Sequence, residues 1–339
     1  MIAAHDVTPV LTLDGQRRLI VGEEIGRGPQ GAVYVGRLES RSEGLTSEPL
    51  RGVGSQASLM RTVAVKVMDP ALFHDTETMA ELVRAVRRLA LVRHPNVVQV
   101  TDYFVASQCP CIVQDLVDGL SLAAFVARWA SARRRLPLDL ALFIACEIAE
   151  GLSGARAAAN VDGTVLNLVH HNLTPRQVLL SWHGEVKVGD FGWRPSAGMI
   201  SGIRRTHGDV HAHVSYLAPE VARGARGDGR SDVFSLGVIL HEMLYGPRFT
   251  REQSAREVLD LVRDGVVTRP LIAPHVPAAI SAIVERACDL DARVRQPHAG
   301  VLAYDLRREA LALGVGDGRM FLRSALFEMA EGVDGHDTV

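Results

Sequence analysis

Apolar and polar residues alternate through the first third of the chain with the two-residue period of β-strands. Residues 19–38 are predicted to form two strands joined by a glycine-rich turn, and residues 61–68 a third strand rich in β-branched side chains. Residues 39–60 are polar, contain many Ser and Gly residues and lack periodicity, so we expect a surface loop insertion there. Residues 96–105 and 109–117 supply two more strands.

Helical periodicity appears in two parts of the chain. Between Asp75 and Arg93 apolar residues recur at three- and four-residue intervals, which predicts an amphipathic helix. After Gly119 the pattern is mainly helical: residues 138–159 are predicted to form a long helix, and residues 231–246 are so apolar that their helix should be buried on most sides. The pattern therefore predicts an α+β protein with a small five-stranded lobe carrying one helix and a larger, mainly helical lobe.

This pattern also predicts how the chain is divided. Residues 1–17 are expected to be an N-terminal extension, 18–118 the β-rich lobe, 119–312 the helical lobe, and 313–339 a tail with a short helix. The change from strand to helix pattern places the boundary between the lobes near Gly119.

Composition narrows the function classes without naming one. Apolar residues make up 47% of the 339 residues and charged residues 22%, which is typical of a globular protein. A net charge of −2 gives no reason to expect nucleic acid or membrane as a partner. No apolar run has the length of a membrane span, and the N-terminus lacks the pattern of a signal peptide. With four cysteines that fit a reducing compartment, we expect a cytoplasmic location.

Two features point to phosphate chemistry. Gly26, Gly28 and Gly31 stand in G-x-G-x-x-G spacing between two predicted strands, where glycines let backbone N–H groups approach phosphate oxygens. Alone, this spacing fits an ordinary hairpin turn equally well, and a dinucleotide fingerprint would need a helix next. The chain also has only two lysines, Lys66 and Lys187, among 37 basic residues, and Lys66 lies in the very next strand.

Further motifs follow the glycine turn and Lys66 in a fixed order: the triplet DFG at 190–192 and the triplet APE at 218–220. With these four motifs the sequence resembles the eukaryotic-like (Hanks-type) Ser/Thr protein kinases of bacteria, from about residue 18 to residue 312. The resemblance implies a bilobal kinase fold. It also implies that Arg295 pairs with Glu220 and that His170 packs against Phe191.

The resemblance implies ATP and Mg²⁺ as cofactors. Adenine would lie between Val33 and Ala64 on one side and Leu179 on the other, bonded to the backbone of Asp115 and Val117. The glycine turn (Gly26, Gly28, Gly31) would cover the phosphates, Lys66 would reach the α- and β-phosphates, and Asp190 would hold magnesium.

The segment HHNLTPRQ, residues 170–177, departs from the family pattern H-R-D-L-x-P-x-N. His171 replaces the arginine that receives an activation-loop phosphate, and Asn172 replaces the catalytic aspartate. Thr174 stands where many members carry lysine, and Gln177 replaces the asparagine that binds a second metal. An amide cannot take a proton as a carboxylate can, and general-base catalysis is worth roughly 10²–10⁴-fold. We therefore expect Asn172 at the catalytic position to impair transfer, and Gln177 to be a weak metal ligand.

Two further departures lie outside this loop. The glutamate that pairs with the strand lysine in the family falls on Ala85, and Glu81, one turn earlier, could replace it only if the helix moved by roughly 5–6 Å. His213 occupies the place of the threonine that supports the catalytic aspartate. Four changes in one mechanism indicate relaxed catalysis on a retained fold.

Three function classes follow from these observations. We expect a pseudokinase that binds ATP with one Mg²⁺, transfers phosphate very slowly or not at all, and acts as a regulatory or interaction module for another protein. One alternative is an active Ser/Thr kinase in which Asn172 orients the substrate and Glu81 replaces the missing glutamate. The other is a scaffold without nucleotide.

The segment before the APE triplet also carries His207, His211 and His213. Close histidine spacing can bind zinc or nickel. A plain surface loop is the more common structure for such a pattern.

Overall fold

The protein is described from a computed structural model, and its chain divides into two compact units. The first comprises residues 1–86 and 99–116, and the second residues 87–98 and 117–339. The structure describes residues 10–14, 17–28, 30–41, 58–73, 76–106, 108–191, 213–250, 252–265 and 273–331.

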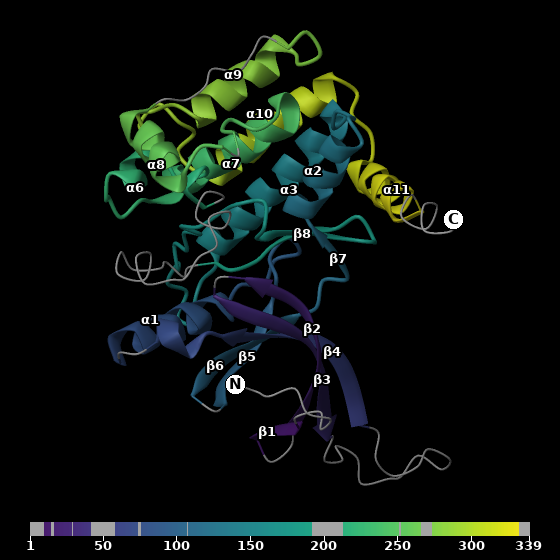
Figure 1. Ribbon diagram of the computed structural model, residues 1–339, viewed down its shortest axis with the longest axis vertical. Coiled ribbons are helices and arrows are strands. Elements are labelled where there is room, and N and C mark those ends of the chain that lie inside the picture. The colour runs from purple at the N-terminus through teal and green to yellow at the C-terminus, as the bar shows by residue number, and fades with distance from the viewer. Residues whose placement is uncertain are drawn as a thin grey trace. The chain divides into compact units, whose positions relative to one another are not determined.

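The first unit is built on one antiparallel sheet of six strands in the order β1-β2-β3-β4-β6-β5 (Figure 1). The strands span Val10–Asp14 (β1), Arg17–Gly28 (β2), Gly31–Arg41 (β3), Ser58–Met68 (β4), Val100–Ala106 (β5) and Cys109–Asp115 (β6). Apolar side chains at alternate positions form its buried core: Leu19, Val21, Leu38, Val63, Val65, Cys111 and Val113. This two-residue spacing is the one from which the strands were predicted.

The sheet is larger than the sequence pattern predicted. β1 pairs with β2 within the segment that was expected to be an extension without a strand, so the sheet has a sixth strand at its edge. β3 and β4 remain paired as far as Arg41 opposite Ser58, so the loop insertion predicted for residues 39–60 was too long at both ends. The last residues of β3 are polar and the first of β4 mix polar and apolar side chains, so the sequence pattern did not mark them as strand. Residues 42–57 lie outside the described part of the chain.

Helix α1 spans Thr76–Leu89 and ends four residues before the predicted limit at Arg93. Its buried side chains Leu82, Val86 and Leu89 are spaced by four and three residues, as an amphipathic helix requires. A short 3₁₀ helix, η1 (Pro70–Leu72), precedes it, with the Asp69 carboxylate accepting a hydrogen bond from the Ala71 N–H.

Residues 96–99 were predicted to be strand, and they are not part of β5. The Asn96 side-chain amide donates to the Glu147 carboxylate at 2.7 Å and to the Val186 carbonyl at 2.9 Å. Val97 forms an isolated bridge with Val188. These contacts hold residues 96–98 within the second unit, whereas Gln99 belongs to the first unit and β5 starts at Val100.

The second unit is mainly helical, as predicted, with a small sheet in the order β7-β8-β9 (Figure 1). Its strands are Gly119–Ser121 (β7), Val178–Ser181 (β8) and Val186–Val188 (β9). Its helices are Leu122–Ser131 (α2), Leu138–Ala157 (α3), Pro219–Ala222 (α6), Gly229–Tyr245 (α7), Ala255–Asp264 (α8), Ala278–Ala287 (α9), Ala299–Ala312 (α10) and Gly318–Glu331 (α11).

Helices α3 and α7 form the centre of this unit and pack against each other, with α10 on α3 and α9 on α7. Both helices are buried on most sides, as the apolar composition of α7 predicted for that helix. Helix α7 begins with a capping box: the Asp228 side chain accepts a hydrogen bond from the backbone N–H of Ser231, and the Ser231 side chain accepts one from the backbone N–H of Asp228. A second capping box, from Ser254 and Glu257, starts α8.

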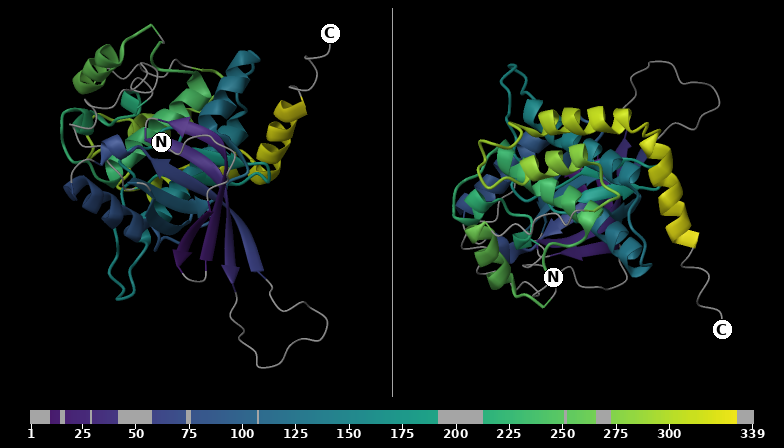
Figure 2. Two further views of the ribbon diagram at one scale, coloured as in Figure 1. Left: turned by 60° about the horizontal axis from the view of Figure 1, so that its bottom comes forward. Right: turned by 90° about the horizontal axis from the view of Figure 1, so that it is seen from above.

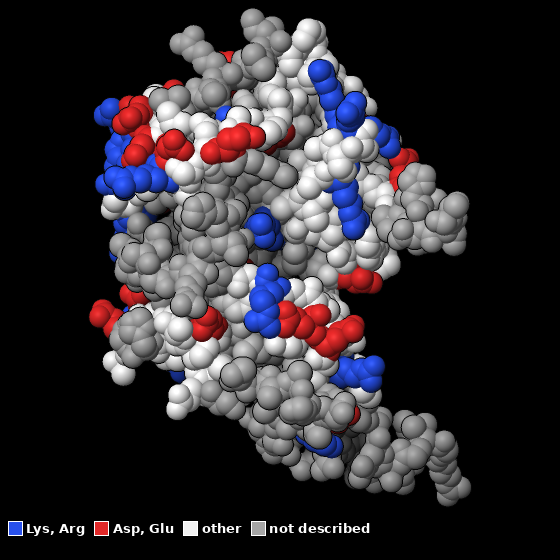
Figure 3. Space-filling view, viewed as in Figure 1, with Lys and Arg blue, Asp and Glu red and all other residues white. Residues whose placement is uncertain are grey.

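The last helix, α11, packs against α3 and turns away from α10 at the edge of the unit (Figure 2). Figure 3 shows basic and acidic side chains lying close together on the face it presents, in keeping with a net charge of −2. Over the described residues, none of the helices combines the length and the apolar character needed to span a bilayer.

Candidate functional site

The glycine-rich turn joins β2 to β3, with Gly26 paired to Val33 and Gly28 to Gly31. Gly31 has φ of +140°, and a Cβ placed there would lie 2.0 Å from the Val67 carbonyl oxygen. A Cβ on Gly26 or Gly28 would meet nothing within 4 Å. Gly31 is therefore required by the packing of the sheet, whereas Gly26 and Gly28 leave open space beside the backbone of the kind that a phosphate group fills.

Lys66 lies on β4, opposite Val33 on one neighbouring strand and Ile112 on the other. It is 9% exposed, and its Nζ donates a hydrogen bond of 2.7 Å to Oε1 of Gln30. Sequence analysis did not anticipate Gln30 as a partner, because the two residues are 36 positions apart and Gln30 lies in the glycine turn. Glu81, the suggested substitute partner, is exposed on α1, and Ala85 is half-buried.

The residues expected around adenine fall on both units. Val33 on β3 is half-buried and Ala64 on β4 is buried. Asp115 ends β6; its N–H donates to the Gln99 carbonyl at 2.9 Å, and its carboxylate pairs with an arginine of β4. Val117 and Leu179 belong to the second unit, where Leu179 lies on β8 opposite Ser121. Their contact with adenine remains a prediction.

The segment that begins at His170 is held by a network of buried polar contacts. The Asp232 carboxylate, at the start of α7, accepts hydrogen bonds from the backbone N–H of His170 at 2.7 Å and of His171 at 3.0 Å. Burial raises the pKa of Asp232 to about 7, against the opposing effect of these two N–H groups. Sequence analysis missed Asp232, because it opens a run that reads as a purely apolar helix.

The His170 ring is fully buried, and burial lowers its pKa to about 4, so it is neutral at pH 7. Its Nε2 lies 2.9 Å from the Gly189 carbonyl oxygen, which can only accept, so Nε2 carries the proton. Nδ1 then accepts from the Asn172 N–H at 3.3 Å. The ring also packs on Phe191 with centroids 4.6 Å apart, which confirms the predicted contact.

Asn172 is 9% exposed, and its side-chain oxygen Oδ1 has no hydrogen-bond partner among the described residues. A buried amide oxygen without a hydrogen bond lowers the stability of the folded protein, so such atoms are rare. Gln177 differs, because its Oε1 accepts a hydrogen bond from the buried Thr174 hydroxyl at 2.5 Å. The structure thus gives the two substituted residues different environments.

Asp190 follows β9 and is half-buried. Its φ is +59°, and that of His171 is +65°. Few residues other than glycine adopt this region, although Asp and His do so more readily than most, and such strain gathers at functional sites. Gly192 lies outside the described residues, so the structure describes the first two residues of the DFG triplet.

Magnesium needs oxygen ligands in near-octahedral geometry and usually keeps several waters. No cluster of three or more His, Cys, Asp or Glu side chains occurs within the described ranges. Asp190 offers one carboxylate, and the Gln177 oxygen already accepts from Thr174. These donors fit one Mg²⁺ held by Asp190, with waters and a ligand's oxygens completing its shell.

The APE triplet is anchored as the resemblance implied. The fully buried Arg295 guanidinium donates to both Glu220 carboxylate oxygens at 2.8 and 2.9 Å, which confirms the predicted pair. Burial acts to raise the pKa of Glu220, but the hydrogen bonds and charge of Arg295 outweigh it and leave that pKa below its usual value. The Ser231 hydroxyl, from the capping box of α7, also donates to Glu220 at 2.7 Å.

Within the activation segment, the structure reaches only the last of the three histidines. His213 is half-buried, whereas His207 and His211 lie outside the described residues. The suggestion of a metal site there therefore remains a prediction.

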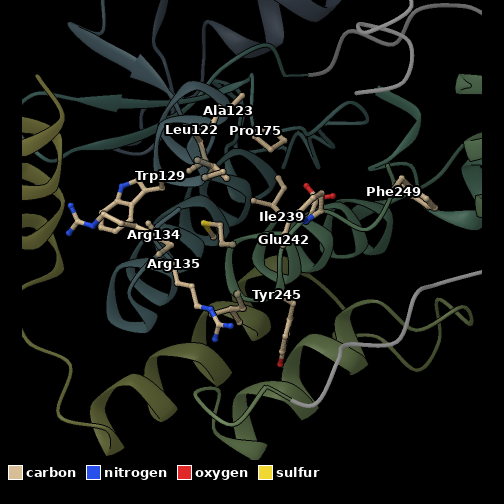
Figure 4. A pocket seen from close by; sticks show the side chains of 18 of the residues that line it. Leu122, Ala123, Trp129, Arg134, Arg135, Pro175, Ile239, Glu242, Tyr245 and Phe249 are labelled. Carbon is tan, nitrogen blue, oxygen red and sulfur yellow. The ribbon is translucent and has the colours of Figure 1, made fainter. Parts of the chain in front are cut away.

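A pocket of about 940 Å³ lies within the second unit, between α2, the catalytic-loop segment 174–176 and α7 (Figure 4). Apolar side chains such as Leu122 and Ile239 line it. At one side the Arg134 guanidinium lies 4.5 Å from the ring centroid of Trp129. Sequence analysis did not find this pocket, because its walls come from segments far apart along the chain.

Comparison with known proteins shows which fold and family these residues belong to. The fold is similar to a solved structure, the kinase domain of PknI from Mycobacterium tuberculosis: the alignment covers 86% of this chain and 96% of that chain, with a TM-score of 0.57. At 21% identity this likeness concerns the fold alone, and it confirms the predicted protein-kinase fold.

Curated relatives are more similar in sequence. The tyrosine-protein kinase MasK of Myxococcus xanthus is 32% identical over 246 residues, 72% of this chain and 38% of that protein. The serine/threonine-protein kinase PkaA of Streptomyces coelicolor is 31% identical over 303 residues, 88% of this chain and 51% of that protein. The chain thus spans about half or less of the length of these relatives. A family model described as protein tyrosine and serine/threonine kinase matches residues 19–303, and the chain therefore belongs to that family.

Proposed function

We propose that this protein binds ATP with one Mg²⁺, transfers phosphate very slowly or not at all, and acts as a regulatory or interaction module for another protein. The observation that carries the proposal is Asn172. It occupies the position of the family's catalytic aspartate, is buried, and has a side-chain oxygen without a partner in the described residues.

Retained nucleotide binding is supported by three features. Gly26 and Gly28 leave open space beside the backbone, Lys66 provides a buried cation on β4, and Asp190 provides a carboxylate after β9. When bound, magnesium would neutralise charge on the phosphates, and Asp190 is the residue that would hold it. The backbone of Asp115 and Val117 would hold the adenine edge.

Loss of transfer is supported by the chemistry of the loop. A carboxylate with an ordinary pKa near 3.9 can accept a proton from a substrate hydroxyl, whereas the Asn172 amide can only accept a hydrogen bond. Losing a positioned general base costs roughly 10²–10⁴-fold in rate. Because the Gln177 oxygen accepts from Thr174, a second metal there would have to compete with that hydrogen bond.

Thermal unfolding with and without ATP and Mg²⁺ tests the binding part of the proposal. A ligand present at 100 times its Kd stabilises a protein by about 2.7 kcal/mol, so the unmodified protein should melt at a higher temperature with nucleotide. Lys66→Ala and Asp190→Ala should remove that shift. If the unmodified protein shows no shift at millimolar ATP, a scaffold without nucleotide is the better reading.

Transfer of radiolabelled phosphate to the protein itself or to a generic basic protein tests the second part. We expect no incorporation above that of Asp190→Ala. Asn172→Asp combined with Gln177→Asn should raise incorporation by roughly 10²-fold or more if these two positions are the main defect. If the double variant stays silent while still binding ATP, Ala85 and His213 contribute to the defect.

The second candidate function is an active Ser/Thr kinase, and the same Asn172 oxygen favours it. An unpartnered acceptor could take the hydrogen bond of an incoming hydroxyl and orient it, which is much of the base's task in a loose transition state. The similar proteins also carry kinase names. Incorporation at ordinary kinase rates that Asp190→Ala abolishes would favour this candidate over the pseudokinase.

A further inference from the structure

Gln30 lies at the tip of the glycine turn and differs from the residues before it. Residues 22–28 are exposed, whereas Gln30 is only 9% exposed. Its carbonyl oxygen accepts a hydrogen bond of 2.8 Å from the Asp69 N–H, beyond the end of β4. The next residue, Gly31, lies so close to the Val67 carbonyl that no larger residue fits. The main chain of Gln30 is therefore fixed against β4 from both directions.

This fixed backbone delivers the Gln30 side chain to Lys66. Oε1 accepts a hydrogen bond of 2.7 Å from Nζ, and each residue is 9% exposed. A buried ammonium group requires acceptors to offset its loss of water. The Gln30 carboxamide supplies one, in the place where a phosphate oxygen would supply another.

We propose that Gln30 is an internal competitor of nucleotide phosphate: its neutral amide oxygen holds the Lys66 ammonium through a hydrogen bond that a phosphate must displace, and so sets nucleotide affinity. This inference rests on the proposed function, since it concerns how the same site binds ATP. Charged acceptors form stronger hydrogen bonds than neutral ones, so phosphate displaces the amide, but part of the binding free energy is spent on breaking the contact.

The competition has a signature that a general loosening of the turn would not produce. Only ligands with phosphates need to displace Gln30, so the affinity for adenosine should not depend on this residue. Gln30→Leu, of similar size, removes the acceptor and should tighten ATP and ADP binding roughly tenfold, the effect of one hydrogen bond to a charged group. Gln30→Glu supplies a charged competitor and should weaken ATP binding by about the same factor.

Titration calorimetry with ATP and Mg²⁺, and separately with adenosine, measures these effects. Lys66→Ala is the background that isolates the mechanism: because the competition acts through the Lys66 ammonium, adding Gln30→Leu should not restore the ATP binding that Lys66→Ala removes. Thr62→Val, on an exposed position of β4, is the matched polar-to-apolar control and should change neither ligand's affinity.

A second measurement needs no nucleotide. The chain has only two lysines, so Lys187 serves as an internal reference; its Nζ donates to the Pro95 carbonyl at 2.8 Å in the second unit. Under limiting acylation of amines followed by peptide mass spectrometry, Gln30→Leu should raise the ratio of Lys66 to Lys187 labelling several-fold. Thr62→Val should leave that ratio as it is in the unmodified protein.

The outcomes separate this inference from the proposed function. Unchanged or weakened ATP binding by Gln30→Leu, or equal tightening of ATP and adenosine, overturns the competitor role while leaving nucleotide binding established. Absence of ATP binding in both the unmodified protein and Gln30→Leu overturns the proposed function and the competition with it. Binding that first appears in Gln30→Leu supports the inference. An unchanged labelling ratio contradicts the Gln30–Lys66 contact itself.

Discussion

Two sets of residues in the second unit differ in how closely they follow the kinase sequence pattern. The residues that hold the catalytic loop and the APE triplet in place have their partners: His170 and His171 bond to Asp232, and Glu220 to Arg295. The residues that would touch the reactants are changed, with Asn172 and Gln177 in place of the family's Asp and Asn. The supporting contacts are present, and the substituted positions are the ones that we propose weaken phosphate transfer.

The physical reason is that replacing the two kinds of residue changes the stability of the folded protein by different amounts. Removing one member of a buried polar pair leaves its partner unsatisfied in the folded protein, so the whole molecule loses stability. The Asn172 oxygen has no such partner among the described residues, whereas the Gln177 oxygen accepts from Thr174. We therefore expect replacement of Asn172 to leave the fold nearly unchanged.

The largest effect should come from Glu220→Ala. It would leave the Arg295 guanidinium, whose side chain is 0% exposed, without its carboxylate, and we expect a loss of about 3–5 kcal/mol in the free energy of unfolding. Chemical denaturation measures it. The control is Asp291→Ala, which removes the partner of the exposed Arg293 and should leave stability nearly unchanged. Equal effects of the two variants would refute the distinction between support and surface pairs.

An intermediate effect is expected in the glycine turn. Gly31→Ala must relieve both a φ of +140° and a 2.0 Å approach to the Val67 carbonyl, which should cost about 2–3 kcal/mol. Gly28→Ala meets open space and should leave the melting temperature in the absence of nucleotide nearly unchanged. Thermal melts of both variants decide the point. A Gly28→Ala protein that unfolds as easily as Gly31→Ala would show that both glycines are structural.

The smallest effect should come from Asn172→Ala. Because its side-chain oxygen has no partner in the described residues, its loss should change the free energy of unfolding by less than about 1 kcal/mol. Urea denaturation of this variant beside Asp232→Ala makes the comparison direct, since the latter leaves two backbone N–H groups without an acceptor. A large loss for Asn172→Ala would assign it to the supporting set.

Much of this arrangement could be predicted from the sequence. The alternation of apolar and polar residues predicted the central strands, helical spacing predicted α1, and the apolar composition of α7 predicted its burial. The pairs His170–Phe191 and Glu220–Arg295 followed from motifs whose spacing carries the geometry.

The remainder depends on contacts between residues distant in the sequence. Asp232 bonds to backbone groups 61 and 62 positions away, and nothing in its neighbours distinguishes it from an ordinary polar residue at a helix start. Gln30 reaches Lys66 only because Gly31 folds the turn against β4. β1 was missed because a short edge strand needs little apolar pattern of its own.

The long ladder between β3 and β4 has a practical consequence. Because Arg41 and Ser58 are held opposite each other, the chain between them leaves and rejoins the sheet at one place. In general, doubling the length of a connection whose two ends are held together costs only about 0.6 kcal/mol. A fluorescent reporter or purification handle could therefore be spliced between these two residues without disturbing the strand register.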